Sequence, residues 1–284
     1  MQLHDFKSVA LNYRAIFFDA YGVLKNHKGL IPGVDLMFQF LRENDIDFYI
    51  LTNDASRSPM ALAAVYQEKG IPEINEHKII SSGMIAREYL RLKVKSGVIA
   101  YLGTPQSAHY VEAIGLKTIS IRDLELEQAD KISALVLLDD EGFDWNHDIN
   151  KAINLVRIKN MPVIVANTDS AYPVSKHELA VAVGSIANMI EHIVGKKFIR
   201  FGKPDAQMFN FAYEHIQKDL RPIQKNEILM VGDTLHTDIL GGNKFGIDTA
   251  LVLSGNTLPH RAEVLIEAYG IIPNYICDSV AINE

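Results

Sequence analysis

Cysteine is nearly absent from this chain, because Cys277 is the single cysteine among 284 residues. One thiol excludes an internal disulfide and fits a reducing compartment. The ten histidines show no close pairing, which argues against a zinc site. Long apolar runs are missing as well, since segments such as Ala134–Leu138 and Met161–Ala166 are far too short to cross a bilayer. Residues Met1–Ala10 contain no apolar stretch of the signal-peptide kind, so we expect a cytoplasmic protein with no membrane partner.

An excess of positive charge is also lacking, since the formal net charge at pH 7 is −7. Binding to a nucleic-acid backbone requires a basic face, so nucleic acid is not expected as a partner. A phosphorylated small molecule stays compatible with this charge, because a single pocket can be cationic in an acidic protein. The hydrophobic share of 48% and the charged share of 22% are those of an ordinary globular chain.

Apolar runs and amphipathic segments alternate along the chain, which predicts an α/β fold with a parallel sheet. The expected strands are Ala15–Phe18, Phe48–Leu51, Ile79–Ser81, Val98–Leu102, Ala134–Leu138, Val163–Ala166, Phe198–Phe201, Ile228–Val231 and Thr249–Leu253. The expected helices are Leu36–Arg42, Pro59–Lys69, Met84–Lys93, Ser107–Ile114, His147–Ile158, Ser185–Val194, Asp205–Gln217 and Thr237–Phe245. The alternation restarts after Gly97, and the first pattern resumes after Gly195.

Charged and hydroxyl side chains stand where four of these strands end. Asp19 follows the first strand, Thr52 the second, and Lys203 comes shortly after the strand that ends at residue 201. Asp233 follows the strand that ends at residue 231, with Asp238 on the next helix. Ligands of parallel α/β sheets bind beyond the carboxyl ends of the strands, so we expect these side chains to share one site.

This set of side chains suits a Mg²⁺ site beside a phosphate site. Mg²⁺ prefers a few hard oxygen ligands and keeps several waters, so two of the two or three carboxylates here and a backbone carbonyl would suffice. Lys203 can neutralise a phosphoryl group, the Thr52 hydroxyl can donate to it, and backbone N–H groups after Asp19 can cradle it. Attack by Asp19 on phosphorus would give an aspartyl-phosphate, which water then hydrolyses.

Each signal alone has a plainer interpretation. The residues after the first strand could be a simple strand-to-turn link, Thr52-Asn53 a turn or helix cap, and Gly202-Lys203-Pro204 a loop before a helix. One of the two acids Asp233 and Asp238 could cap a helix. Four such signals in a fixed order, all at strand ends, would not be expected by chance, and the conjunction therefore favours function.

Longer motifs surround these residues and extend over most of the chain. They are Phe17–Leu24, Leu51–Ser58, Gly202–Pro204, Gly232–Asp238 and Leu251–Gly255, with Ala166–Pro173 and Gly184–Ile186 between them. Their order and spacing resemble the haloacid dehalogenase-like (HAD) hydrolases, and in particular the NagD / 4-nitrophenylphosphatase-like branch, which includes sugar-phosphate, nucleotide and pyridoxal phosphatases. The resemblance implies a Mg²⁺-dependent phosphatase of a small phosphorylated metabolite, in which a sugar phosphate is one candidate substrate.

The resemblance also implies a role for each matching residue. Asp19 would be the nucleophile. The metal would be bound by Asp19, the backbone carbonyl of Tyr21, Asp233 and Asp238. The phosphate would be held by Ala20, Tyr21, Thr52, Asn53 and Lys203. Asn167 and Asp169, in the segment similar to the cap of this branch, would contact polar groups of the substrate, although an Asx-turn that only shapes the loop is an equal alternative.

The resemblance implies a fold as well: a doubly wound, parallel-sheet (Rossmann-like) core with an inserted α/β cap of the C2 type. The core would comprise residues 1–96 and 197–284, and the cap, residues 97–196, would select the substrate. Relatives with such a cap often form dimers, so a homodimer is favoured.

Tyr21 departs from the family pattern. Phosphatases of the family place a second aspartate there, as general acid and base. A phenol with a pKa near 10 stays protonated at neutral pH, so it can donate a proton but activates water poorly. Loss of a general acid–base group commonly costs about 10²–10⁴-fold in rate. We therefore expect slow turnover or, as an alternative, an impaired relative that only binds a phosphometabolite. Dehalogenases carry the same Asp-Ala-Tyr-Gly but use no Mg²⁺, so the retained Asp233 and Asp238 disfavour dehalogenation.

Overall fold

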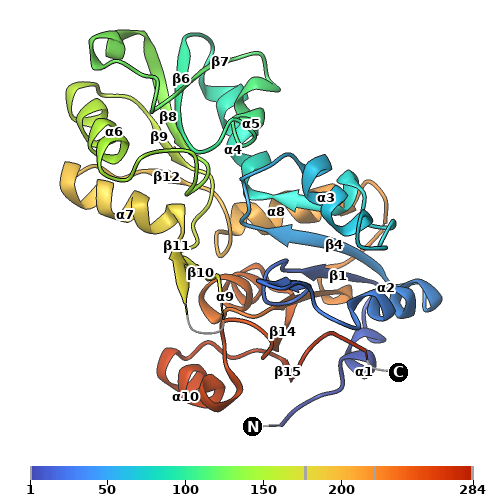
Figure 1. Cartoon of the computed structure of the whole chain (residues 1–284). Coiled ribbons are helices and arrows are strands. Elements are labelled where there is room, and N and C mark those ends of the chain that lie inside the picture. The colour runs from blue at the N-terminus through green and yellow to red at the C-terminus, as the bar shows by residue number, and fades with distance from the viewer. Residues whose placement is uncertain (1, 176–177, 221, 283–284) are drawn as a thin grey trace. The chain divides into compact units, whose positions relative to one another are not determined.

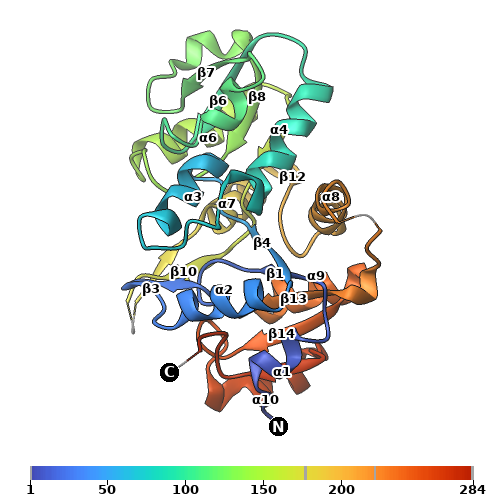
Figure 2. The same ribbon diagram turned by 90° about the vertical axis from the view of Figure 1, so that its right-hand side faces the viewer.

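The computed structural model describes residues 2–175, 178–220 and 222–282. Within this range the chain forms two compact units. The first unit runs to Thr52, includes Pro59–Ile80 and resumes at Lys203. The second unit consists of Asn53–Ser58 and Ser81–Gly202. Figures 1 and 2 show the elements of both units in two views.

A six-stranded sheet forms the centre of the first unit, with the strand order β15-β14-β13-β1-β4-β5. The strands are β1 (Ala15–Phe18), β4 (Asp47–Thr52), β5 (Ile79–Ser81), β13 (Ile228–Gly232), β14 (Asp248–Val252) and β15 (Tyr275–Cys277). β1 pairs in parallel with β4 on one side and with β13 on the other. The strands that follow β1 in the chain, β4 and β5, lie on one side of it, and the later strands β13, β14 and β15 lie on the other. Ligands of open α/β sheets bind where the strand order reverses in this way.

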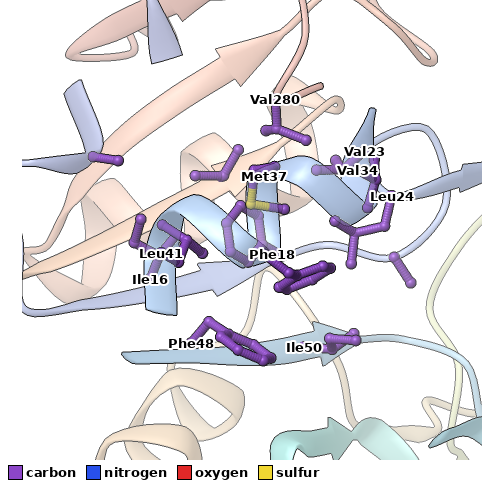
Figure 3. Packing of buried hydrophobic residues seen from close by; sticks show 14 of the residues in the cluster. Ile16, Phe18, Val23, Leu24, Val34, Met37, Leu41, Phe48, Ile50 and Val280 are labelled. Carbon is purple, nitrogen blue, oxygen red and sulfur yellow. The ribbon is translucent and has the colours of Figure 1, made fainter. Parts of the chain in front are cut away.

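Helices pack on both faces of this sheet, because alternate strand residues point to opposite faces. The helices of the first unit are α1 (Phe6–Ala10), α2 (Val34–Glu43), α3 (Pro59–Gln67), α8 (Ala206–Ile216), α9 (Leu240–Phe245) and α10 (Pro259–Tyr269). Figure 3 shows Phe18 of β1 beside Met37 of α2 within one buried cluster. On the other face, Met230 and Thr249 lie against Gly242 of α9. Both strand faces are therefore buried, as a doubly wound sheet requires.

Helix α2 illustrates how the sequence forms these elements. Val34, Met37, Phe38 and Leu41 recur at helical spacing, and all are buried against the sheet. The charged residues Asp35, Arg42 and Glu43 are exposed, so this segment is a surface helix with one apolar face.

Shorter elements complete the first unit. They are the antiparallel pair β2 (Lys25–Asn26) and β3 (Gly29–Leu30), and the single turns η1 (Glu76–Lys78), η3 (Lys225–Glu227) and η4 (Leu235–Ile239).

The second unit contains its own parallel sheet, with the order β12-β9-β8-β6-β7. The strands are β6 (Val98–Leu102), β7 (Lys117–Ser120), β8 (Ile132–Leu137), β9 (Val163–Val165) and β12 (Ile199–Arg200). The helices are α4 (Ser82–Lys93), α5 (His109–Glu112), α6 (His147–Ile158) and α7 (Val183–Val194), with the turn η2 (Leu126–Lys131). β10 (Ala171–Pro173) and β11 (Leu179–Val181) form an antiparallel pair. A separate buried cluster, built on β6, β8 and β9, fills this unit.

The prediction of an α/β fold with parallel sheets is confirmed. The longer segment of the second unit begins at Ser81 and so includes α4. The assignment of residues 97–196 to a cap domain stays a prediction. Throughout residues 2–175, 178–220 and 222–282, every helix is too short or too polar to cross a membrane.

Candidate active site

Three carboxylates gather at the carboxyl ends of two neighbouring strands. Asp19 directly follows β1 and Asp233 directly follows β13. Asp238 lies on η4, a short π-helix that begins two residues after Asp233. Each side chain offers a carboxylate oxygen, and these oxygens all lie within 4.8 Å of one another. Such a set of hard oxygen donors suits a divalent cation.

Lys203 lies among these carboxylates and is 2% exposed. Its Nζ donates to Asp19 Oδ1 and to Asp238 Oδ1, in both cases at 2.6 Å. Burial by itself lowers the pKa of Lys203, but the charges of Asp19 and Asp238 outweigh burial and leave the pKa above that of an ordinary lysine. Lys203 is therefore a cation at any physiological pH.

Three carboxyl groups share a single lysine in this cluster. Burial, together with the charges of Asp19 and Asp238, raises the pKa of Asp233 well above its usual value. Burial also raises the pKa of Asp238 to about 7, although Lys203 opposes this shift. These raised pKa values mean that one lysine does not suffice to keep all three buried carboxyl groups ionised. A further cation would favour their ionised forms.

Asp233 is fixed from several sides. Its Oδ2 accepts a hydrogen bond from the backbone N–H of Asn256 at 2.7 Å. A Cβ atom on Gly22 would lie 2.0 Å from this oxygen, and one on Gly255 would lie 1.9 Å from it. Because Gly22 has a positive φ of 86°, a side chain there would be strained as well. Glycine at both positions is therefore what allows the carboxylate to occupy this place.

Thr234 connects the two acids of the motif that follows β13. Its hydroxyl donates to Asp233 Oδ1 at 2.8 Å, and its backbone N–H donates to Asp238 Oδ2 at 3.1 Å. Asn256 Nδ2 donates in turn to the Thr234 hydroxyl at 2.9 Å. The contacts by which Thr234 and Asn256 position these acids were not predicted from the sequence. Thr234 could have been recognised from its place directly after Asp233.

Other predicted residues of the site lie in the same unit. Thr52 ends β4, the strand beside β1, and is buried. Ala20 and Tyr21 form the turn after β1, in which the Ala20 carbonyl accepts hydrogen bonds from the N–H groups of Leu24 and Lys25. Burial raises the pKa of the Tyr21 phenol above its ordinary value, so the hydroxyl is protonated at neutral pH. The structure thus brings Asp19, Lys203, Asp233 and Asp238 together, and places Thr52 and the Ala20-Tyr21 turn on the adjoining strand ends.

Asn53, Asn167 and Asp169 belong to the second unit. The side chain of Asn167 accepts a hydrogen bond from the backbone N–H of Asp169 at 2.8 Å, which is the Asx-turn considered as an alternative for this segment. The carboxylate of Asp169 accepts a hydrogen bond from Asn53 Nδ2 at 2.8 Å. The structure therefore joins two predicted residues, Asn53 and Asp169, that stand far apart in the sequence.

Comparison with known protein families matches the chain in two places. Residues 16–117 match the family model of haloacid dehalogenase-like hydrolases. Residues 200–282 match a second model, described as HAD-hydrolase-like. The first match contains Asp19 and Thr52, and the second contains Lys203, Asp233 and Asp238.

Individual proteins are similar over nearly the whole length. A crystal structure of a possible sugar phosphatase of the HAD superfamily from Cytophaga hutchinsonii is 54% identical, covers 100% of both chains and gives a TM-score of 0.95. Dihydroxyacetone phosphatase from Corynebacterium glutamicum is 28% identical over 263 residues, 93% of this chain and 88% of that protein. Chronophin from Bos taurus is 26% identical over 275 residues, 94% of this chain and 91% of that protein.

Proposed function

Because the chain belongs to the haloacid dehalogenase-like hydrolases, we propose that it is a Mg²⁺-dependent phosphomonoester hydrolase that acts on a small phosphorylated metabolite through an aspartyl-phosphate on Asp19. The observation that carries this proposal is the buried cluster in which Lys203 bridges Asp19 and Asp238 while Asp233 stands beside them. This cluster combines an anionic nucleophile, a cation for the phosphate and oxygen donors for a metal.

The donor set fits Mg²⁺. Asp19, Asp233 and Asp238 offer hard oxygens, and the charge that Lys203 leaves unbalanced favours a divalent cation. The backbone carbonyl of Tyr21 is the fourth proposed ligand. When bound, Mg²⁺ supplies charge that screens the repulsion between a carboxylate and a phosphate.

Asp19 is the proposed nucleophile. Its carboxylate oxygen forms a bond to phosphorus while the ester P–O bond breaks, and the leaving alkoxide takes up a proton. Lys203 neutralises the phosphoryl oxygens during this step. Water then attacks phosphorus, releases phosphate and returns Asp19 to its carboxylate form. The phosphoryl group is held meanwhile by Thr52, Asn53 and the backbone of the Ala20-Tyr21 turn.

Tyr21 is the proposed proton donor to the leaving group, since its phenol is protonated at neutral pH. The same phenol activates water poorly, so breakdown of the aspartyl-phosphate is the slow step. The names of the relatives support a small substrate, because they include a sugar phosphatase and a dihydroxyacetone phosphatase.

Release of inorganic phosphate from a panel of sugar, glycerol and aryl phosphates, with Mg²⁺ and with a chelator, tests this function. We expect release with Mg²⁺, loss with the chelator and recovery on adding Mg²⁺ back. Asp19→Asn should abolish release, whereas Asp35→Asn, an exposed aspartate on α2, should not. A folded protein that releases phosphate from no member of the panel would count against the proposal.

Tyr21 favours one alternative, a protein that binds a phosphometabolite without hydrolysing it. Calorimetric binding of phosphate esters together with absent turnover would support that alternative. Halide release without metal would instead indicate a dehalogenase.

A further inference from the structure

We propose that Asp169 is a positioning residue of the phosphate site: its hydrogen bond to Asn53 fixes the backbone of Asn53 in the orientation that phosphate binding requires. This inference rests on the proposed function, in which Asn53 helps to hold the phosphoryl group. It gives Asp169 a role that differs from direct contact with the substrate.

The amide group of Asn53 is held at both of its ends. Its Nδ2 donates to Asp169 Oδ1 at 2.8 Å and to Thr168 Oγ1 at 3.2 Å. On the other side, a Cβ atom on Gly202 would lie 2.7 Å from Asn53 Oδ1, so the Gly202 backbone packs closely against the amide oxygen. The residue is 1% exposed. The Asn53 side chain is therefore enclosed by the second unit and serves as an anchor.

Asp169 is itself held by backbone contacts that do not involve its carboxylate. Its N–H donates to Asn167 Oδ1 at 2.8 Å, and its carbonyl accepts a hydrogen bond from the N–H of Gly184 at 3.1 Å. Gly184 stands in the first turn of α7, where a Cβ atom would lie 2.5 Å from the Asp169 carbonyl oxygen. The carboxylate thus projects from a segment packed tightly on a helix, which makes it a rigid acceptor.

The carbonyl of Asn53 is fixed as well, because Ser82 Oγ at the start of α4 donates to it at 2.9 Å. Because its side chain is held by Asp169 and its carbonyl by Ser82, the backbone of Asn53 is restricted in its rotation about the Cα atom. The proposed contact of this residue to a phosphate oxygen is its backbone N–H. A hydrogen bond to a carboxylate is strong enough to maintain the backbone conformation on which that contact depends.

Two possible effects of Asp169 on phosphate affinity have opposite signs: the effect of its negative charge and the effect of its positioning of Asn53. Removing the negative charge of Asp169 would strengthen the binding of an anion if charge alone mattered. Loss of positioning has the opposite effect, since misplacing a binding group by about 1 Å can cost roughly 10²-fold. A weaker phosphate affinity in a variant that has lost an acid therefore indicates positioning.

The experiment compares Asp169→Ala with the wild type on 4-nitrophenyl phosphate, on glycerol phosphate and with inorganic phosphate as the inhibitor. We expect kcat/KM to fall by roughly 10- to 100-fold on both esters, and the Ki of inorganic phosphate to rise by a similar factor. Asp169→Asn, which keeps an acceptor oxygen, should recover part of this loss. Asp123→Ala is the matched control, because Asp123 is an exposed aspartate of the same unit that accepts a hydrogen bond from Ser120.

A double-variant cycle completes the test. Asn53→Ala removes the group on which Asp169 acts, so adding Asp169→Ala to it should cause little further loss. Thermal unfolding of each variant shows whether it is folded.

Three outcomes would overturn the inference: additive losses, a loss confined to one ester, or an unchanged Ki for phosphate in a folded Asp169→Ala. If the wild type neither binds inorganic phosphate nor releases it from any ester, the proposed function itself fails, and that result is distinct from the three.

Discussion

Lys203 and Asp238 form an ion pair inside the first unit: Nζ lies 2.6 Å from Oδ1, and the two side chains are 2% and 1% exposed. Asp19 accepts a second hydrogen bond from the same ammonium group. Buried charges are costly unless they are paired. Lys203 therefore stabilises the fold as well as providing a cation for the proposed phosphate site.

Lys203→Met should destabilise the metal-free protein, because it leaves buried carboxylates without their cation. We expect the free energy of unfolding to fall by about 3–5 kcal/mol, measured by urea denaturation in the presence of a chelator. Lys28→Met, at an exposed lysine of the same unit, should leave the stability nearly unchanged. Equal stability of the two variants would mean that the ion pair contributes nothing to folding.

Gly22→Ala should displace Asp233 and weaken metal binding. The added Cβ would lie 2.0 Å from Asp233 Oδ2, and loss of such support typically lowers metal affinity by about 10- to 100-fold. Gly70→Ala is a matched control, because Gly70 has a similar φ of 90° and open space around it. Calorimetric titration should show weaker Mg²⁺ binding for Gly22→Ala and unchanged binding for Gly70→Ala. If the Mg²⁺ affinity fell equally in both variants, backbone strain and not contact with Asp233 would be the cause.

Tyr21→Asp should raise the turnover number. An aspartate at this position can accept a proton from water, and a general base commonly contributes about 10²–10⁴-fold. Steady-state kinetics on 4-nitrophenyl phosphate with saturating Mg²⁺ measures the change, with Tyr21→Asn as the variant that lacks both a base and a phenol. If Tyr21→Asp is no faster than Tyr21→Asn, another residue already acts as the base.

Asp139, in the second unit, should make stability depend on pH. Burial, and then the charge of Asp140, raises the pKa of Asp139 to about 6 in the folded protein, against 3.8 for the ordinary side chain. The folded state therefore keeps its proton between about pH 4 and pH 6 while the unfolded chain loses it. The contribution of protonated Asp139 to the stability of the folded state is complete below about pH 4. This contribution is lost as the pH rises through about 6.

Asp139→Asn removes this titration and keeps an oxygen that can accept the hydrogen bond from the N–H of Asp140. From pH 4 to pH 7 the wild type should lose stability relative to Asp139→Asn, because only the wild type must ionise this buried side chain. The difference in the free energy of unfolding should reach up to roughly 2–3 kcal/mol. Urea denaturation at several pH values measures it, and parallel pH profiles would contradict the assignment.

The sequence predicted the strand ends of the site because each depends on a local pattern. A short apolar run followed directly by Asp19, or by Gly232 and Asp233, marks a buried parallel strand and the group at its end. Parallel pairing of β1 with β13 and β4 then brings such groups together without any knowledge of side-chain contacts.

Contacts made by side chains distant in the sequence could not be predicted in this way. The hydrogen bond between Asn53 and Asp169 joins residues 116 positions apart, and the sequence around either residue gives no indication of its partner. The same holds for Asn256 and Thr234, which meet only because β14 lies beside β13.

Two predicted helices also differ from the structure for local reasons. The helix expected over Ser107–Ile114 is limited to α5, since Ser107 Oγ donates to the Thr104 carbonyl and forms a turn before it. The helix expected over Thr237–Phe245 begins earlier, as the wider turn η4, and that wider turn is where Asp238 is found.

The close approach of Gly22 and Gly255 to Asp233 limits how this sequence can diverge. Any side chain at either glycine competes with the carboxylate for the same volume. Related chains that keep the aspartate should keep both glycines, and larger residues should be found at these two positions in lineages that have lost the aspartate. The three positions should therefore evolve together, although more than two hundred residues separate the first from the last.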